Sequence, residues 1–151
     1  MFDKFLEEYK EILYKCEKPS RYIGGEFLSF QKDFDKSDVK MLFAFPDKYE
    51  IGISNFGHKI LYNIVNKRED LIADRVYAPE MDFCNLLKEN NRLLYGLDTK
   101  RQMKDFDFIG FALQYELSYT TILAMLDMGG VPVLNKERKN SIKKKGFLIL
   151  L

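Results

Sequence analysis

The fold is decided by the stretch Phe43-Ala44-Phe45-Pro46-Asp47-Lys48-Tyr49-Glu50-Ile51-Gly52-Ile53-Ser54-Asn55-Phe56-Gly57. An apolar run ends there, breaks into a polar, aromatic-rich loop, and is followed by the start of an amphipathic helix. The stretch Gly110 to Tyr119 repeats the same order. Dense apolar runs of this length are typical of parallel strands buried on both faces. Open α/β sheets bind ligands where such strands end, so the two loops are the first candidate site.

The rest of the chain alternates between helical and strand patterns. Apolar residues at helical spacing predict helices over residues 3–16, 55–67, 80–90 and 118–128. Strands are predicted over 39–45, 72–77, 93–95 and 107–113, with later strands at 131–133 and 147–151. Residues 17–37 are predicted as an extended lead-in with a turn near Lys36 and Ser37. The side chains expected to point inward from two of the helices are Phe56, Ile60, Leu61, Ile64, Ile122, Leu123, Met125 and Leu126.

This alternation predicts a three-layer α/β fold, flavodoxin-like or Rossmann-like, with a parallel sheet covered on both faces. We divide the chain into a lead-in, residues 1–37, and an α/β domain, residues 38–151. The apolar run Phe147 to Leu151 has the composition of another core strand, and the chain stops there. We therefore expect a fold incomplete at its C-terminus, with an open sheet edge prone to self-association.

Composition limits the function classes. The 151 residues are 46% apolar and 31% charged with a net charge of +1, as in a soluble globular protein. The start of the chain lacks a secretory signal, and no run reaches the ~20 apolar residues of a membrane span. Cys16 and Cys84 stand far apart, which favours free thiols in the cytoplasm. The basic residues after Leu134 are typical of a solvated surface loop, so we do not expect nucleic acid binding.

The first loop offers two kinds of chemistry. Asp47 and Glu50 flank Tyr49, and two carboxylates beside a tyrosine can shift one another's pKa for acid–base work. Simple solvation of the loop explains the same residues. Ser54, Asn55 and Gly57 stand where the next helix begins, and they suit either an N-cap or an anion site.

The second loop supplies a matching polar wall. Gln114, Tyr115 and Glu116 follow the strand over 107–113, and we expect Gln114 and Tyr115 to point into the crevice between the loops. Ser118 is predicted to cap the helix that continues through Tyr119. Pro79, after the strand over 72–77, shapes a third loop at the same edge.

Residues from about Arg21 to Val133 resemble the amino-terminal domain of a group of cobalamin-binding-type radical S-adenosylmethionine (radical SAM) proteins. The resemblance is strongest over Phe43 to Gly57 and Gly110 to Tyr119. It implies a [4Fe–4S] cluster, held by a CxxxCxxC run, that binds S-adenosylmethionine. Cys16 and Cys84 have no cysteine neighbours, so this chain does not build that cluster. The resemblance thus implies that the radical SAM core lies in a missing part, on the same or a companion chain.

Cobalamin is the other cofactor that the resemblance implies. Methionine-synthase-type domains ligate cobalt through the histidine of an Asp-x-His-x-x-Gly motif, but Phe56 and Leu61 replace the Asp and Gly around His58. Histidine ligation is therefore disfavoured, and corrinoid binding without a protein ligand stays open. The alternative for His58 is a surface or helix-start histidine without a metal role.

The leading hypothesis is an accessory, cobalamin-binding-like domain of a radical SAM protein. Its loops 46–58, 78–82 and 114–119 would face the substrate or cofactor, and the chain alone is not expected to catalyse the radical reaction. The second hypothesis is a non-catalytic α/β module that binds a protein or a small anion through the same edge. The third is a flavin-binding electron carrier, although the loop is poorer in Thr and Gly than flavodoxin phosphate loops. No dinucleotide or P-loop motif is present.

Overall fold

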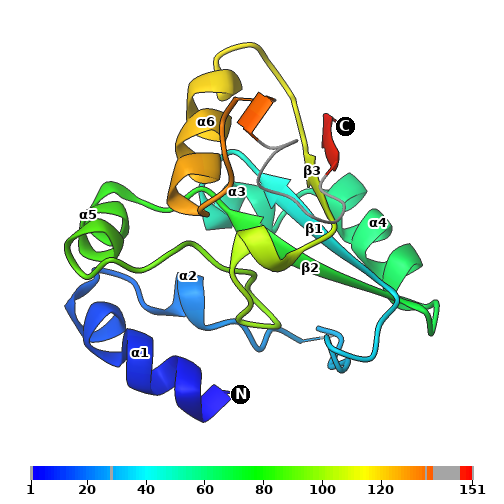
Figure 1. Cartoon of the computed structure of the whole chain (residues 1–151), viewed down its shortest axis with the longest axis horizontal. Coiled ribbons are helices and arrows are strands. Elements are labelled where there is room, and N and C mark those ends of the chain that lie inside the picture. The colour runs from blue at the N-terminus through cyan, green and yellow to red at the C-terminus, as the bar shows by residue number, and fades with distance from the viewer. Residues whose placement is uncertain (1, 28, 135, 138–146, 151) are drawn as a thin grey trace.

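The computed structural model describes residues 2–27, 29–134, 136–137 and 147–150. Seen along the chain, it forms the elements shown in Figure 1: α1 (Phe2–Lys15), α2 (Ser20–Ile23), β1 (Val39–Phe45), α3 (Tyr49–Gly52), α4 (Phe56–Asn66), β2 (Leu71–Tyr77), α5 (Met81–Glu89), the 3-10 turn η1 (Met103–Asp105), β3 (Phe108–Phe111), α6 (Ser118–Met128) and β4 (Phe147–Leu150). Most of the predicted basic tail lies outside the described residues.

The four strands form one parallel sheet in the order β2-β1-β3-β4. Val39 of β1 pairs with Leu71 of β2, and Met41 pairs with Phe108 of β3. The chain moves from β1 to β2 in one direction and then crosses back to β3, so the order reverses beside β1. This is the topological switch of flavodoxin-like sheets, and it confirms the predicted fold class.

Helices cover both faces of the sheet. Figure 1 shows α4 on one face and α5 and α6 on the other. The larger core lies on the α5 and α6 face and also takes in α1 through Phe5, Tyr9 and Ile12. On the α4 face, Phe43 of β1 and Ala73 of β2 pack against Tyr62 of α4. The lead-in therefore shares its core with the sheet, while the division at residue 37 stays a prediction.

The outer edge of β2 is covered rather than open. The side chain of Asn66 donates to the carbonyl of Ala73 at 2.9 Å and accepts from its amide at 3.0 Å. Farther along, the amide of Leu97 donates to the carbonyl of Arg75 at 2.7 Å. Since unpaired backbone groups at a sheet edge invite aggregation, Asn66 and Leu97 take the place of a neighbouring strand.

Helix α4 lies where it was predicted but shows the opposite side to the sheet. His58, Tyr62 and Asn66 are buried, while the expected inner side chains Phe56, Ile60, Leu61 and Ile64 are exposed. The physical reason is that polar side chains of α4 bond to groups beneath the helix. Tyr62 donates to Asp98, and Asn66 donates to the carbonyl of Ala73 in β2. The predicted orientation of this helix is wrong.

Three further expectations are wrong. Residues 17–37 are not wholly extended, because Pro19 at φ −56° starts the single turn α2 and Gly24 at φ +70° ends it. Residues 93–95 contribute only one antiparallel bridge, from Tyr95 to Gln102. No strand forms at 131–133, where Pro132 lacks the amide that a strand needs.

Helix α6 is oriented mostly as predicted. Ile122, Met125 and Leu126 are buried, but Leu123 is 46% exposed. The helix ends at Gly129, and Gly130 adopts φ +68° to turn the chain away. Among the described residues, no helix is long and apolar enough to cross a membrane.

Candidate functional site

Three loops leave the same edge of the sheet. Because β1, β2 and β3 are parallel, the segments after Phe45, Tyr77 and Phe111 all begin at their carboxyl ends. These segments contain every residue singled out from the sequence as a candidate site residue. We call this edge, formed by residues 46–58, 78–82 and 112–119, the rim. The expected common placement of the loops is confirmed, and their role in binding stays a prediction.

The first loop is tied down by the lead-in. The hydroxyl of Tyr49 donates to Glu26 at 2.9 Å, and its ring meets the edge of Tyr77 at 5.3 Å between centroids. Burial, together with the bond to Glu26, raises the pKa of Tyr49 to about 12. Tyr49 is therefore a neutral hydrogen-bond donor near pH 7 rather than a base.

Charged side chains around this loop neutralise one another. Arg21 of α2 lies 2.8 Å from Glu50 and 3.3 Å from Glu80. Lys48 reaches Glu80 at 2.9 Å. The hydrogen bond from Arg21 lowers the pKa of Glu50, which stays ionised. Asp47 accepts from the amide of Lys48 at 2.7 Å. This geometry gives Tyr49 and Glu50 structural partners, Glu26 and Arg21. Burial raises the pKa of Tyr49 most, and the charge of Glu50 contributes to the same rise.

The start of α4 is a capped helix. Asn55 accepts from the amide of His58 at 2.9 Å, as the capping interpretation predicts. Ser54 instead donates to the carbonyl of Glu50 at 2.8 Å, and Gly57 is exposed. One amide at the helix start is thus already satisfied from within the chain.

His58 is buried, so its interpretation as a surface residue is wrong, whereas its predicted place at the start of a helix is confirmed. The side chain is 4% exposed and lies among the rings of Phe43, Phe45 and Tyr77, at 5.9, 5.6 and 6.0 Å between centroids. Neither ring nitrogen has a hydrogen-bond partner among the described residues. Burial and the charge of Arg75 lower the pKa of His58 to about 4. A cobalt ion at the rim would not reach this enclosed imidazole.

The second loop is the most exposed part of the rim. Gln114, Tyr115 and Glu116 are exposed, as is Tyr119. Ser118 is buried and is not the N-cap, since Leu117 holds that position without a side-chain cap. Pro79, in the third loop, is half-buried.

Apolar and aromatic side chains stand out from the rim. All of the following are between 47% and 80% exposed, and each follows the end of a strand: Ile51, Phe56, Met81, Tyr115, Leu117 and Tyr119. Large contiguous apolar patches mark binding surfaces, so these exposed side chains make the rim a candidate binding surface.

A buried ionic cluster was missed in the sequence. The guanidinium of Arg75 lies 3.0 Å from Asp98 and 2.9 Å from Glu26, and 4.4 Å from the centre of the Tyr62 ring. A sequence signal for this cluster exists, because the charged pair Asp74 and Arg75 interrupts the otherwise apolar strand β2. This cluster joins the lead-in, β2, α4 and the loop after Tyr95.

Asp74 completes the cluster from the other face of β2. Its carboxylate accepts from the amides of Asp98 and Thr99, both at 2.8 Å, and from the Thr99 hydroxyl at 2.6 Å. Gly96 leaves room for it, since a Cβ there would lie 2.2 Å from Asp74 Oδ2. Burial and the neighbouring Asp74 raise the pKa of Asp98 to about 7, against the effect of Arg75.

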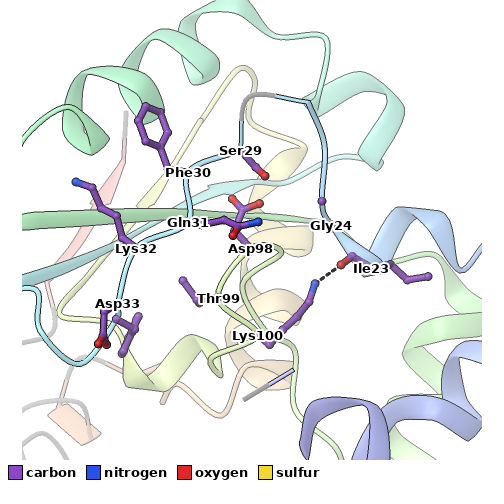
Figure 2. A pocket seen from close by; sticks show the side chains of 12 residues that line it. Ile23, Gly24, Ser29, Phe30, Gln31, Lys32, Asp33, Asp98, Thr99 and Lys100 are labelled. Atoms are coloured by element: carbon purple, nitrogen blue, oxygen red, sulfur yellow. Dashed lines mark hydrogen bonds between the residues drawn. The ribbon is translucent and has the colours of Figure 1, made fainter. Parts of the chain in front are cut away.

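A cavity of about 620 Å³ opens between residues 23–25 and 29–34 on one side and residues 98–100 on the other. Figure 2 shows Gln31 close to Asp98 near its centre, while the amine of Lys100 donates to the carbonyl of Ile23. The cavity contains none of the residues predicted for the site. Asp98, which lines this cavity, pairs with Arg75, and so does Glu26 of the lead-in.

The cysteines do not form a metal site. Cys16 is buried and Cys84 half-buried, and both thiols are free. Within the described ranges, no group of three or more His, Cys, Asp or Glu side chains could hold a metal ion. The residues present therefore do not fit an iron–sulfur cluster.

A parallel sheet in this order, with exposed aromatic side chains at its carboxyl edge, defines a flavodoxin- or Rossmann-like α/β domain. A comparison with family models matches residues 57–148 to radical SAM proteins, N-terminal. The match covers more than half of the chain, so the chain belongs to this family, whose whole proteins use S-adenosylmethionine and a [4Fe–4S] cluster. The predicted radical SAM relationship is confirmed, and its cobalamin-binding form stays a prediction. No curated protein and no solved structure matches the chain.

Proposed function

We propose that this accessory domain lines the substrate or cofactor side of a radical SAM active site. The iron–sulfur core would be supplied by another part of the protein or by a companion chain. The observation that carries the proposal is the exposed aromatic and apolar rim, at the sheet edge where open α/β folds bind ligands. Membership of the N-terminal family supports the presence of a radical SAM partner.

The rim residues have separate tasks in this function. Tyr115, Leu117 and Tyr119 would cover the reacting region and exclude water. Glu50 and Glu80 are already paired with Arg21 and Lys48, so they hold the loops in position rather than move protons. When bound in the partner, the cluster and S-adenosylmethionine supply the radical chemistry.

Photo-crosslinking tests the placement of the rim. In a full-length protein carrying this domain and its radical SAM part, Tyr115 is replaced by p-benzoylphenylalanine. Irradiation should join this position to peptides near the cluster-binding cysteines, as identified by mass spectrometry. Tyr14 on α1, 78% exposed, is the matched control and should give no such product. Products from Tyr14 and none from Tyr115 would contradict the proposal.

A more specific form of the proposal is that the rim binds cobalamin. Since His58 is enclosed, a corrinoid would bind at the rim without a protein ligand to cobalt. Titration with hydroxocobalamin, followed by its visible spectrum, should then show a shift that the rim variant Tyr115→Ala weakens. An unchanged spectrum at high micromolar corrinoid would remove cobalamin while leaving the accessory function in place.

A further inference from the structure

Helix α4 carries apolar side chains on the side that faces away from the sheet. Phe56, Ile60 and Ile64 repeat every four residues and are 79%, 54% and 58% exposed. We call these three residues the α4 stripe; Leu61, 39% exposed, lies beside it. On the opposite side of the same helix, His58, Tyr62 and Asn66 are buried.

This arrangement reverses that of an ordinary surface helix. A helix on one face of a sheet normally turns its apolar side inward and its polar side to water. Here the inner side is fixed by the bonds of Tyr62 and Asn66, and His58 is buried without a partner for its ring nitrogens among the described residues. The apolar side is therefore left for a second contact.

We propose that the α4 stripe docks this domain onto its radical SAM part, on the same or a companion chain, in an apolar groove bordered by carboxylates. The inference rests on the proposed function and adds the surface that holds the two parts together. Residues spaced by four form a ridge on a helix, and such a ridge packs into the groove of a partner surface.

The positive charge of α4 indicates which side chains should border the partner's groove. Between Phe56 and Asn66 there is no Asp or Glu, and Lys59 is the one charged side chain. His58, in the same helix, is buried and neutral. Lys67 follows directly, and no ion pair is found for Lys59 or Lys67 within the described part of the chain. Carboxylates on the partner would complement these amines.

The same charges argue against a second copy as the occupant. A two-fold contact of α4 against α4 would bring Lys59 and Lys67 of both copies together with no acidic residue on either helix. Like charges brought together at an interface are unfavourable. The position of the stripe favours the radical SAM part instead, because Phe56 belongs to the rim and the stripe extends from it along the domain.

Cysteine labelling tests this surface. Ile60→Cys and Ile64→Cys are made in the 151-residue chain and in a full-length protein that joins it to its radical SAM part. Maleimide modification at each site is followed by mass spectrometry. We expect modification at both sites to be at least tenfold slower in the full-length protein. Tyr14→Cys, on the far side of the sheet, is the control and should react equally fast in both.

Each outcome separates the two proposals. Equal rates at residues 60 and 64 in both proteins would overturn the docking surface, whereas the Tyr115 crosslinks would still support the proposed function. Protection that already appears in the 151-residue chain and disappears on dilution would assign the stripe to a second copy and also overturn the inference. If Ile60→Glu releases the domain in the full-length protein, shown by faster proteolysis between the two parts and an unchanged melting temperature of the 151-residue chain, the inference is supported.

Discussion

At the scale of single residues, His58 shows how far this domain departs from ordinary packing. Its imidazole is enclosed by three aromatic rings, and neither ring nitrogen has a hydrogen-bond partner within the part of the chain that the structure describes. Burying a polar group in this way is unfavourable, and charging it there is more so. His58 is therefore a site where the stability of the fold depends on pH.

We expect acid to destabilise the chain through His58. The unfolded histidine binds a proton near pH 6.5, whereas the folded one, whose pKa is lowered by burial to about 4, does not. Between these values the unfolded state binds more protons, so stability falls as pH falls. From pH 7 to pH 4 the loss in free energy of unfolding from this group should be about 3 kcal/mol, measured by urea denaturation.

The variant His58→Phe is the control for this prediction. It keeps Asp98, whose raised pKa of about 7 acts in the opposite direction, so stability from Asp98 is lost as pH rises from about 4 to about 7. The difference between wild type and His58→Phe therefore isolates the histidine. A difference that stays constant from pH 7 to pH 4 would contradict the buried, neutral imidazole.

Arg75 should be the most costly side chain to remove from the ionic cluster. Arg75→Met leaves the buried carboxylate of Asp98 and the half-buried one of Glu26 without their counter-ion. Removing one partner of a buried pair costs about 3–5 kcal/mol. Urea denaturation should show a loss of that size. Adding Asp98→Asn should recover part of it, because one unpaired charge is then removed. Strict additivity of the two single variants would argue against direct coupling.

At the scale of elements, α4 protects the edge of β2. Asn66→Leu would leave the amide and carbonyl of Ala73 unpaired, at about 1–3 kcal/mol for each buried group. The Ala73 amide should also exchange with solvent deuterium much faster. Asn63→Leu is the matched control, since the Asn63 side chain donates to the carbonyl of Lys59 in the same helix, and it should change stability by about 0.5 kcal/mol or less. Equal effects of both variants would show that Asn66 does not protect this edge.

The sequence predicted the elements of this sheet better than their surroundings. Val39 to Phe45 is β1 as expected, because a short, dense apolar run with aromatic residues favours a buried strand over a helix. The orientation of α4 could not be predicted in the same way. Its apolar stripe has ordinary helical spacing, and only tertiary contacts, from Tyr62 to Asp98 and from Asn66 to Ala73, turn it outward.

The location of the candidate site could be predicted from the sequence, but the partners of its charged side chains could not. Parallel pairing brings Glu50, Pro79 and Tyr115 to one edge, as the alternation of strands and helices requires. The partners of the charges come from the lead-in, through Arg21 and Glu26, across distances that no local pattern reveals. For the same reason the sequence alone does not show that Tyr49 bonds to Glu26 or that Glu50 pairs with Arg21.

At the scale of the whole molecule, the lead-in and the sheet share one apolar core. Tyr9, Ile12 and Leu13 of α1 are each 6% exposed or less and belong to the core that covers the α5 and α6 face. Glu26 also supplies a carboxylate to Arg75 of β2. Residues 1–37 thus contribute both apolar packing and a counter-ion to the sheet.

Removing residues 1–37 should therefore abolish cooperative folding. Loss of a single large core side chain costs roughly 2–5 kcal/mol, and several are lost together, against a total stability of about 5–15 kcal/mol. Residues 38–151 alone should show weak near-ultraviolet circular dichroism and no sharp urea transition. The control Tyr14→Ala removes an exposed side chain from α1 and should leave the transition of the full chain in place. A sharp transition for residues 38–151 would instead show that the sheet folds without α1 and that residue 37 is a boundary between independently stable parts.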